Sequence, residues 1–449
     1  MSEARAWRSF ESDGWRPSSP AFPPHGSLGK ATDSGLLPVL IVLAAVLFNA
    51  GLAIINAHVT PLSANVVIAA EVLIVVAAHT VIFANYRPQM LPWYAMIVII
   101  VLFSLERSMI VGNFDPKFMR DVLLIPTFVL LGMTTPQRRT TTLIVILHLV
   151  VVSGVLLEAF FTQTFSSLFE VRQYYLATRP FDAANFWNAS SDLFVSATRP
   201  GNRFLNFVDF HRISSVFLEP VSLGNYVTII TAFLCANYRF MSRKVLVFLI
   251  LGNAIALVGC DGRLAAVSSA LIVLAALASP WLPRKSALLY LPGALVCAAI
   301  IVVVDHPNPL EDNFLGRIAY TVDLLTRYDV LEWFGNSDRL IGPAADSGIA
   351  YTITTQSMVG LIAFWFFLVL NAEDRTLYQI RYLHGICIYI TFTMLVSYSL
   401  FSIKTAALLW FIYGSLQMAS QQKKASSVRA TRVRRDPSVR PQFSHGPAW

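Results

Sequence analysis

Charged residues gather at the ends of apolar segments, and their types suggest chemistry on a phosphate. Arg212 and Glu219 flank the start of one apolar segment. Asp261 and Arg263 form a turn between two others, and Asp346 opens a further one. An ionisable group inside a membrane span costs about 2.5–3.5 kcal/mol, so each position requires a reason. Guanidinium groups bind phosphate through paired hydrogen bonds, and a nearby carboxylate can accept a hydroxyl proton. The set predicts a site for a phosphate donor and a hydroxyl acceptor.

A structural interpretation of the same residues stays open. Arg212 with Glu219, and Asp261 with Arg263, can equally be ion pairs that close helix ends. Other titratable groups are weaker candidates, because structural hydrogen bonding or simple solvation explains them: Glu71, His79, His148 and His306. The four cysteines are far apart and form no CxxC or Cys/His cluster, so we expect neither a metal site nor a cofactor.

The composition places the chain in a membrane. Of its 449 residues, 55% are hydrophobic and only 13% are charged, where a soluble domain carries about 25%. This excludes a disordered chain, a disulfide scaffold and a soluble nucleic-acid binder. The net charge of +8 does not indicate a nucleic-acid partner, because seven cations and one acid at 421–449 supply +6 of it.

Runs of about 20 apolar residues, each long enough to cross a bilayer, recur along the chain. They predict an all-α polytopic membrane protein with about twelve spans. A polar leader at 1–35 precedes a transmembrane domain at 36–420, and a basic tail follows at 421–449. The predicted spans are 36–55, 66–84, 93–111, 119–135, 141–160, 216–236, 245–259, 264–281, 286–304, 346–370, 384–400 and 403–419.

The distribution of Lys and Arg predicts the orientation. With both termini in the cytoplasm, 21 of the 34 cations lie on the inner side. The two long loops, about 161–215 and 305–345, then face outward, as do all the charged segment ends described above. Loops carry function disproportionately, so we expect the protein to work on the outer face.

Three motifs resemble those of bacterial Wzy-type polysaccharide polymerases and their relatives, the O-antigen ligases. The first is Arg212-x-Ser-Ser-x-Phe-x-Glu219-Pro-x-x-x-Gly224, and the second is Cys260-Asp261-Gly262-Arg263. The third is Phe-Gly-Asn at 334–336, followed by Asp346-Ser-Gly and Tyr351-x-x-x-x-Gln at 351–356. The motifs keep the family's order over roughly residues 205–370.

The resemblance implies a GT-C-like fold with two large periplasmic loops in the bacterial inner membrane, and an inverting glycosyltransferase that needs no metal. Such a polymerase joins undecaprenyl-pyrophosphate-linked repeat units for exopolysaccharide, capsule or O-antigen. Arg212 and Arg263 would hold the donor pyrophosphate, and Arg339 is added from its charge and loop position. Glu219 or Asp346 would accept or orient the hydroxyl proton.

Asp346 stands where the ligases carry a histidine, which argues for a polymerase rather than a ligase. Two alternatives stay open: an O-antigen ligase, and a flippase or other transporter of lipid-linked oligosaccharide. Expected partners are the lipid-linked donor and acceptor, membrane lipids, a chain-length regulator and a flippase. No P-loop is present, so we expect no ATP-driven transport.

Overall fold

The computed structural model describes residues 35–179, 191–198, 211–311, 313–344 and 346–418. These residues form helices and connecting turns, with no strand among them. The helices are α2 (Leu37–Val46), α3 (Phe48–His58), α4 (Ala64–Ala84), α5 (Leu91–Val111), α6 (Pro116–Met133), α7 (Gln137–Phe160), α8 (Thr162–Phe169), α9 (Val171–Thr178), α10 (Pro220–Asn237), α11 (Arg243–Cys260), α12 (Arg263–Ala278), α13 (Tyr290–Asp305), α14 (Phe314–Thr326), α15 (Val330–Trp333), α16 (Ile341–Ala344), α17 (Gly348–Leu370), α18 (Leu377–Val396) and the helix at 403–418.

The all-helical architecture confirms the prediction of a polytopic membrane protein. Hydrocarbon offers no hydrogen bonds to the backbone, so a spanning segment must satisfy its own N–H and C=O groups, as an α-helix does. Among the described residues, seven helices are long and apolar enough to cross a membrane. The pair α2 and α3, bent by 65° at Leu47, adds an eighth if it counts as one span.

The remaining four predicted spans, 119–135, 264–281, 384–400 and 403–419, coincide with α6, α12, α18 and the helix at 403–418. These helices fall outside the group of long apolar helices, so twelve spans remains a prediction. The leader up to residue 34 and the basic tail lie outside the described residues.

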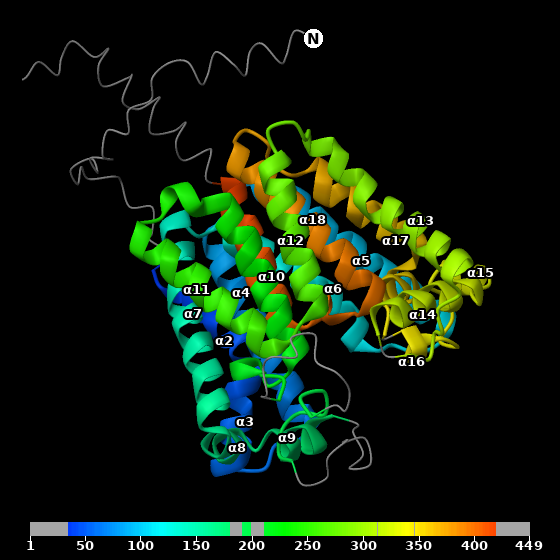
Figure 1. The fold of residues 1–449 in the computed structure, drawn as a ribbon. Helices are drawn as coiled ribbons and strands as arrows, with labels where there is room; N and C mark the ends of the chain where they lie inside the picture. Colours follow the sequence, from blue (N-terminus) through cyan, green and yellow to red (C-terminus); the bar gives the residue numbers. More distant parts are fainter. Residues whose placement is uncertain (1–34, 180–190, 199–210, 312, 345, 419–449) are drawn as a thin grey trace, which may run out of the picture. The chain divides into compact units, whose positions relative to one another are not determined.

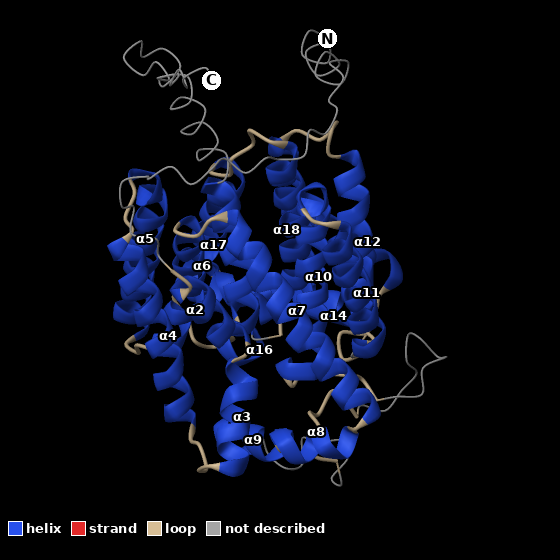
Figure 2. Ribbon diagram, turned by 90° about the vertical axis from the view of Figure 1, so that its left-hand side faces the viewer, coloured by secondary structure: helices blue, strands red, loops and turns tan. Residues whose placement is uncertain are grey.

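Three helices form the centre of the bundle. α10, α12 and α18 pack against one another and lie side by side in Figures 1 and 2. α10 is buried along most of its length, whereas α4 and α13 expose Leu, Ile and Val along most of theirs. The exposed apolar faces suit contact with lipid chains, and the buried centre is where polar side chains are enclosed by protein.

The two predicted loops contain short helices. α8 and α9 occupy part of the first loop and form a layer with α3 beyond the ends of the long helices (Figure 2). α14, α15 and α16 occupy the second loop. Segments from both loops meet around one cavity, together with the α11–α12 turn and the end of α18. We call this end of the bundle the loop end.

The backbones of α6 and of the helix at 403–418 lie unusually close to each other at two glycines. A Cβ atom on Gly414 would lie 2.0 Å from the Val129 carbonyl oxygen, and one on Gly132 would lie 2.2 Å from the Phe411 carbonyl oxygen. Small residues at such crossings let two membrane helices approach closely enough for extensive van der Waals contact.

We therefore expect Gly414→Ala to destabilise the protein by about 1–3 kcal/mol, the usual cost of overpacking, because the added methyl group meets rigid backbone. Thermal unfolding of the purified protein in detergent measures the effect. Gly293→Ala in α13 is the matched control, since a Cβ there meets nothing within 4 Å. Equal unfolding temperatures for the two variants would contradict this packing.

Candidate functional site

A cavity of about 730 Å³ opens at the loop end, among α10, α12, α14 and α18. Three arginines, Arg212, Arg263 and Arg317, line it together with Asp261 and His211. Sequence analysis predicted that Arg212 and Arg263 would share one phosphate site, and the structure places them around the same cavity although they are 51 positions apart. Arg317 joins them from α14 in the second loop.

Backbone contacts hold Arg212 at the cavity. Its Nε donates a hydrogen bond to the Cys260 carbonyl oxygen at 3.2 Å, and its Nη1 donates to the Ser196 carbonyl oxygen at 3.4 Å. The next residue, Ile213, donates from its backbone N–H to the Gly259 carbonyl oxygen at 2.9 Å. The last part of the first loop is thereby attached to the end of α11, which precedes the turn that carries Arg263.

The turn between α11 and α12 brings Arg263 and a helix N-terminus to the cavity. Asp261 ends α11 with φ +49°, the left-handed conformation in which many helices end and which Asp adopts more readily than most other non-glycine residues. Gly262 caps α12, and Arg263 is its first residue. The unpaired N–H groups of a helix N-terminus favour anions, so the α12 terminus and the Arg263 guanidinium act in the same direction.

A glycine contact allows this turn to lie close to α10. A Cβ on Gly262 would lie 3.1 Å from the Ala265 Cβ and from the Cys260 Sγ, and 3.8 Å from the Gly224 Cα. Larger side chains at these positions would push α12 away from α10. Arg317 closes the far side of the cavity, where its Nη1 donates to the Val396 carbonyl oxygen at 3.2 Å at the end of α18.

His211 forms a pair with Glu158 that sequence analysis missed. The His211 Nε2 lies 3.1 Å from the Glu158 Oε1, and the Glu158 side chain is fully buried. The other carboxylate oxygen of Glu158 accepts hydrogen bonds from the backbone N–H groups of Ser214 at 2.8 Å and Ser215 at 2.6 Å. Such a carboxylate holds an imidazole in one orientation and leaves its other ring nitrogen for a proton. The sequence did contain a signal for this pair. Glu158 is an acidic residue within the predicted span 141–160, where an ionisable group is costly and normally has a specific partner.

Glu219, a predicted proton acceptor, faces away from the cavity into an ion-pair cluster. Its carboxylate lies 2.5 Å from the Lys404 Nζ and 2.7 Å from the Arg179 Nη1, and it accepts a hydrogen bond from the Ser222 hydroxyl at 2.9 Å. Lys404 is 3% exposed. A carboxylate held by two cations is a poor proton acceptor, so this position favours a structural role.

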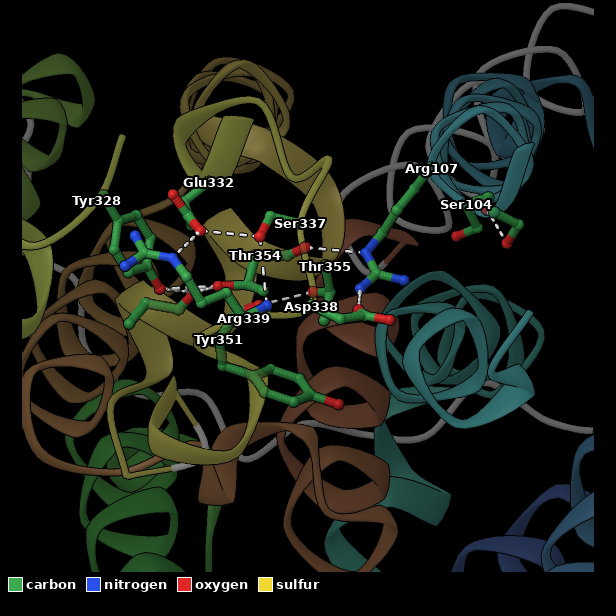
Figure 3. A network of polar contacts seen from close by, with 12 residues as sticks. Ser104, Arg107, Tyr328, Glu332, Ser337, Asp338, Arg339, Tyr351, Thr354 and Thr355 are labelled. Atoms are coloured by element: carbon green, nitrogen blue, oxygen red, sulfur yellow. Dashed lines mark hydrogen bonds and ion pairs between the residues drawn. The ribbon is translucent and has the colours of Figure 1, made fainter. Parts of the chain in front are cut away.

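Asp346 and Arg339 also lie apart from the cavity lining. Asp346 is exposed in the turn before α17. The Arg339 Nε donates to the Glu332 Oε1 at 2.8 Å, and its Nη2 donates to the Arg327 carbonyl oxygen at 2.9 Å, as Figure 3 shows for the first of these contacts. The structure thus unites two of the five predicted residues and separates the other three from them.

The Arg339 contacts belong to a network that attaches the second loop to α5 and α17 (Figure 3). Arg107 of α5 pairs with Asp338, and its Nε donates to the Thr354 carbonyl oxygen at 3.0 Å. That carbonyl lies just before Ser357, where α17 is broken by a non-helical residue. Arg107 therefore satisfies a backbone group beside the break and fixes the loop at the same time.

Three of the weaker candidates make structural contacts within the bundle. Glu71 pairs with Arg120, which also contacts Asp121 at 2.7 Å. His79 contacts the backbone carbonyl oxygen of Val75, and His148 contacts the Tyr226 hydroxyl. In the part of the chain that the structure describes, no three His, Cys, Asp or Glu residues gather in a way that could hold a metal ion.

Comparisons with protein-family models, with curated proteins and with solved structures find no match for this chain. A function for this protein must therefore be inferred from the geometry of the cavity.

The buried Glu332 makes the second loop sensitive to acid. The hydrogen bond from Arg339 and those from Asp329 and Ser337 hold the pKa of Glu332 well below its usual range. A carboxyl whose pKa is lower in the folded state stabilises the fold above its unfolded pKa of about 4.3, and this stabilisation is lost as the pH falls toward the folded value.

We expect the unfolding temperature of the wild-type protein to fall more between pH 5 and pH 2.5 than that of Glu332→Gln. In this range the unfolded wild-type chain binds a proton at Glu332 while the folded protein holds the carboxylate ionised, and Glu332→Gln has no such group. Asp323→Asn removes the exposed pair with Arg327 and serves as the control, which should follow the wild type. Thermal unfolding at a series of pH values measures all three proteins. Parallel curves for wild type and Glu332→Gln would contradict the role of this pair.

Proposed function

We propose that this protein is a polysaccharide polymerase that joins undecaprenyl-pyrophosphate-linked repeat units at the periplasmic face of the bacterial inner membrane. The observation that carries the proposal is the cavity at the loop end, where Arg212, Arg263 and Arg317 surround one space at the start of α12. A GT-C-like architecture, both termini in the cytoplasm, and a role in exopolysaccharide, capsule or O-antigen synthesis belong to the same proposal.

The arginines suit a pyrophosphate leaving group. Each guanidinium offers hydrogen bonds in a planar fork that matches phosphate oxygens, and such charge-assisted bonds contribute about 1.5–3 kcal/mol each. Negative charge develops on the departing pyrophosphate in the transition state, so preorganised cations stabilise that state more than the ground state. Arginines placed in this way act without requiring a metal ion.

In the proposed reaction, an acceptor sugar hydroxyl attacks the anomeric carbon of the donor. The new glycosidic C–O bond forms as the bond from that carbon to the pyrophosphate oxygen breaks, and the anomeric centre inverts. With Nε2 protonated and held by Glu158, His211 Nδ1 is the group that we assign to accept the hydroxyl proton. His211 takes the role that sequence analysis gave to Glu219 or Asp346, because it lines the cavity and they do not.

Substitutions can distinguish the role of the arginines that line the cavity from that of the other arginines in the loops. We expect Arg263→Gln and Arg317→Gln each to lower the rate of glycan transfer roughly 10- to 100-fold, which corresponds to the loss of one or two phosphate hydrogen bonds. Arg339→Gln is the matched control and should stay near the wild-type rate, since Arg339 contacts Glu332 outside the cavity lining.

The assay for these variants uses purified protein and lipid-linked repeat units extracted from a strain that lacks it. Product length on a gel and gel filtration of each variant separate lost transfer from lost folding. Full-length polymer at the wild-type rate from folded Arg263→Gln and Arg317→Gln would exclude the proposed donor site.

Substitution of His211 should lower the rate of the transfer step more than it weakens substrate binding. We expect His211→Gln to reduce transfer by roughly a hundredfold or more, the usual contribution of general base catalysis, while the KM for the donor changes little. His306→Gln is the control, because His306 is an exposed histidine in the second loop. An equal effect of the two substitutions would show that His211 is not the base.

A further inference from the structure

The cavity extends beyond the arginines into the helix bundle. Ser268 lies five residues after Arg263 in α12, about 7.5 Å further along the helix axis. Tyr389 and Thr393 in α18 precede Val396 by seven and three residues, so they reach about 10 Å and 5 Å below the end of that helix. All three side chains line the cavity and are at most 2% exposed. We call this deeper part the inner chamber.

Three hydroxyl groups of the inner chamber find no partner among the described residues outside the chamber. Within the described residues, the Ser268 Oγ finds no hydrogen-bond partner, and the hydroxyls of Tyr389 and Thr393 have none apart from each other. Leaving a buried hydroxyl unsatisfied costs about 1–3 kcal/mol, so groups of this kind normally indicate a ligand or ordered water. Even with a contact between Tyr389 and Thr393, the three hydroxyls keep unused donors and acceptors around one space.

The inner chamber is closed below. One turn beyond Thr228, which also lines it, the Thr231 hydroxyl contacts the Ser269 hydroxyl at 3.3 Å and accepts a hydrogen bond from the Asn253 amide at 3.0 Å. These side chains are buried among α10, α11 and α12. On α18, one turn before Tyr389, a Cβ on Gly385 would lie 3.1 Å from the Ala232 Cβ of α10 and 3.3 Å from the Ile272 Cγ2 of α12, so the three helices meet below the chamber. A ligand must therefore enter from the loop end, and whatever occupies the inner chamber is the end of its molecule.

The residues of the inner chamber define the class of ligand. Thr228, Ser268, Tyr389 and Thr393 are neutral, so a phosphate belongs at the arginines rather than here. A lipid chain would leave the hydroxyls unsatisfied. A sugar ring instead offers several hydroxyls that both donate and accept, together with apolar C–H faces that can contact Tyr389.

We propose that the inner chamber binds one neutral sugar ring at the end of a glycan chain. The assignment rests on the proposed function for its role: this ring is the non-reducing terminal sugar of the acceptor. A ring within a chain carries glycosidic bonds on two sides, so the chain beyond it would have to turn back and leave the closed chamber by the way it entered. A terminal ring carries one, and it can present a hydroxyl toward the donor at the arginines and toward His211.

The test measures sugar binding without any turnover. A panel of neutral methyl glycosides (of glucose, galactose, mannose, rhamnose and N-acetylglucosamine, in both anomers) represents terminal sugars, and purified protein in a zwitterionic detergent without a sugar headgroup avoids competition. Saturation-transfer NMR reports binding. Thr393→Val keeps the volume and removes one hydroxyl of the inner chamber. Thr391→Val is the matched control, because Thr391 is equally buried on α18, has a hydroxyl with no hydrogen-bond partner among the described residues, and lies outside the cavity lining.

We expect at least one methyl glycoside to bind, with an affinity that falls roughly 3- to 10-fold in Thr393→Val, as the loss of one hydrogen bond predicts, and in Ser268→Ala. Binding in Thr391→Val should match the wild type, and binding in Arg263→Gln should persist because the ring does not use the arginines. Absence of binding by every glycoside, or equal affinities in Thr393→Val and Thr391→Val, would overturn the proposal.

The experiments distinguish failure of the proposed function from failure of the inner chamber assignment. If transfer survives in the arginine variants while glycoside binding still depends on Thr393, the inner chamber remains a sugar site in a protein that is not this polymerase. If the arginines prove essential for transfer and no glycoside binds, the donor site stands and the inner chamber assignment is wrong.

Discussion

The carboxylate of Glu219 meets two cations where α10 begins, and the arrangement of the loop end depends on this cluster. Lys404 comes from the helix at 403–418 and Arg179 follows α9, so three elements distant in sequence converge on one side chain. Buried charges are costly to desolvate, and removal of one partner from such a cluster costs about 3–5 kcal/mol because the others are left uncompensated. The cluster thereby holds the first turn of α10, whose residues Pro220 and Gly224 line the cavity.

In the proposed function, the features of the cavity act on different parts of one substrate complex. Its mouth carries three arginines and the N-terminus of α12, which favour phosphate, and the Glu158–His211 pair, which can take up a proton. Its inner chamber is neutral and carries three hydroxyls that find no partner outside the chamber among the described residues. The second loop supplies Arg317 to the same mouth, and Arg107 fixes a neighbouring part of that loop beside the break in α17. The proposal thus separates phosphate binding, proton transfer and sugar recognition along the depth of a single space.

The sequence predicted the helices well, because apolar runs long enough to cross a bilayer leave few alternatives to an α-helix. It also placed Arg212 and Arg263 together, since both lie at the outer ends of predicted spans and therefore at the same level of the membrane. It could not place Arg339, whose position depends on a contact with Glu332 inside an irregular loop. The Glu158–His211 pair joins residues 53 positions apart, and hydropathy does not reveal which helix faces meet. Neither the bend at Leu47 nor the break at Ser357 is marked by a proline, although the polar run 354–357 leads into the break.

The most direct test of the central claim is the pool of lipid-linked glycans in a strain that lacks this protein, sized by mass spectrometry. The proposed polymerase predicts single repeat units that accumulate on the periplasmic side of the lipid, with polymer absent. Long polymer retained on the lipid would instead indicate a ligase. Single units confined to the cytoplasmic side would indicate a flippase, and either result would contradict the assignment of the arginine cavity to chain elongation.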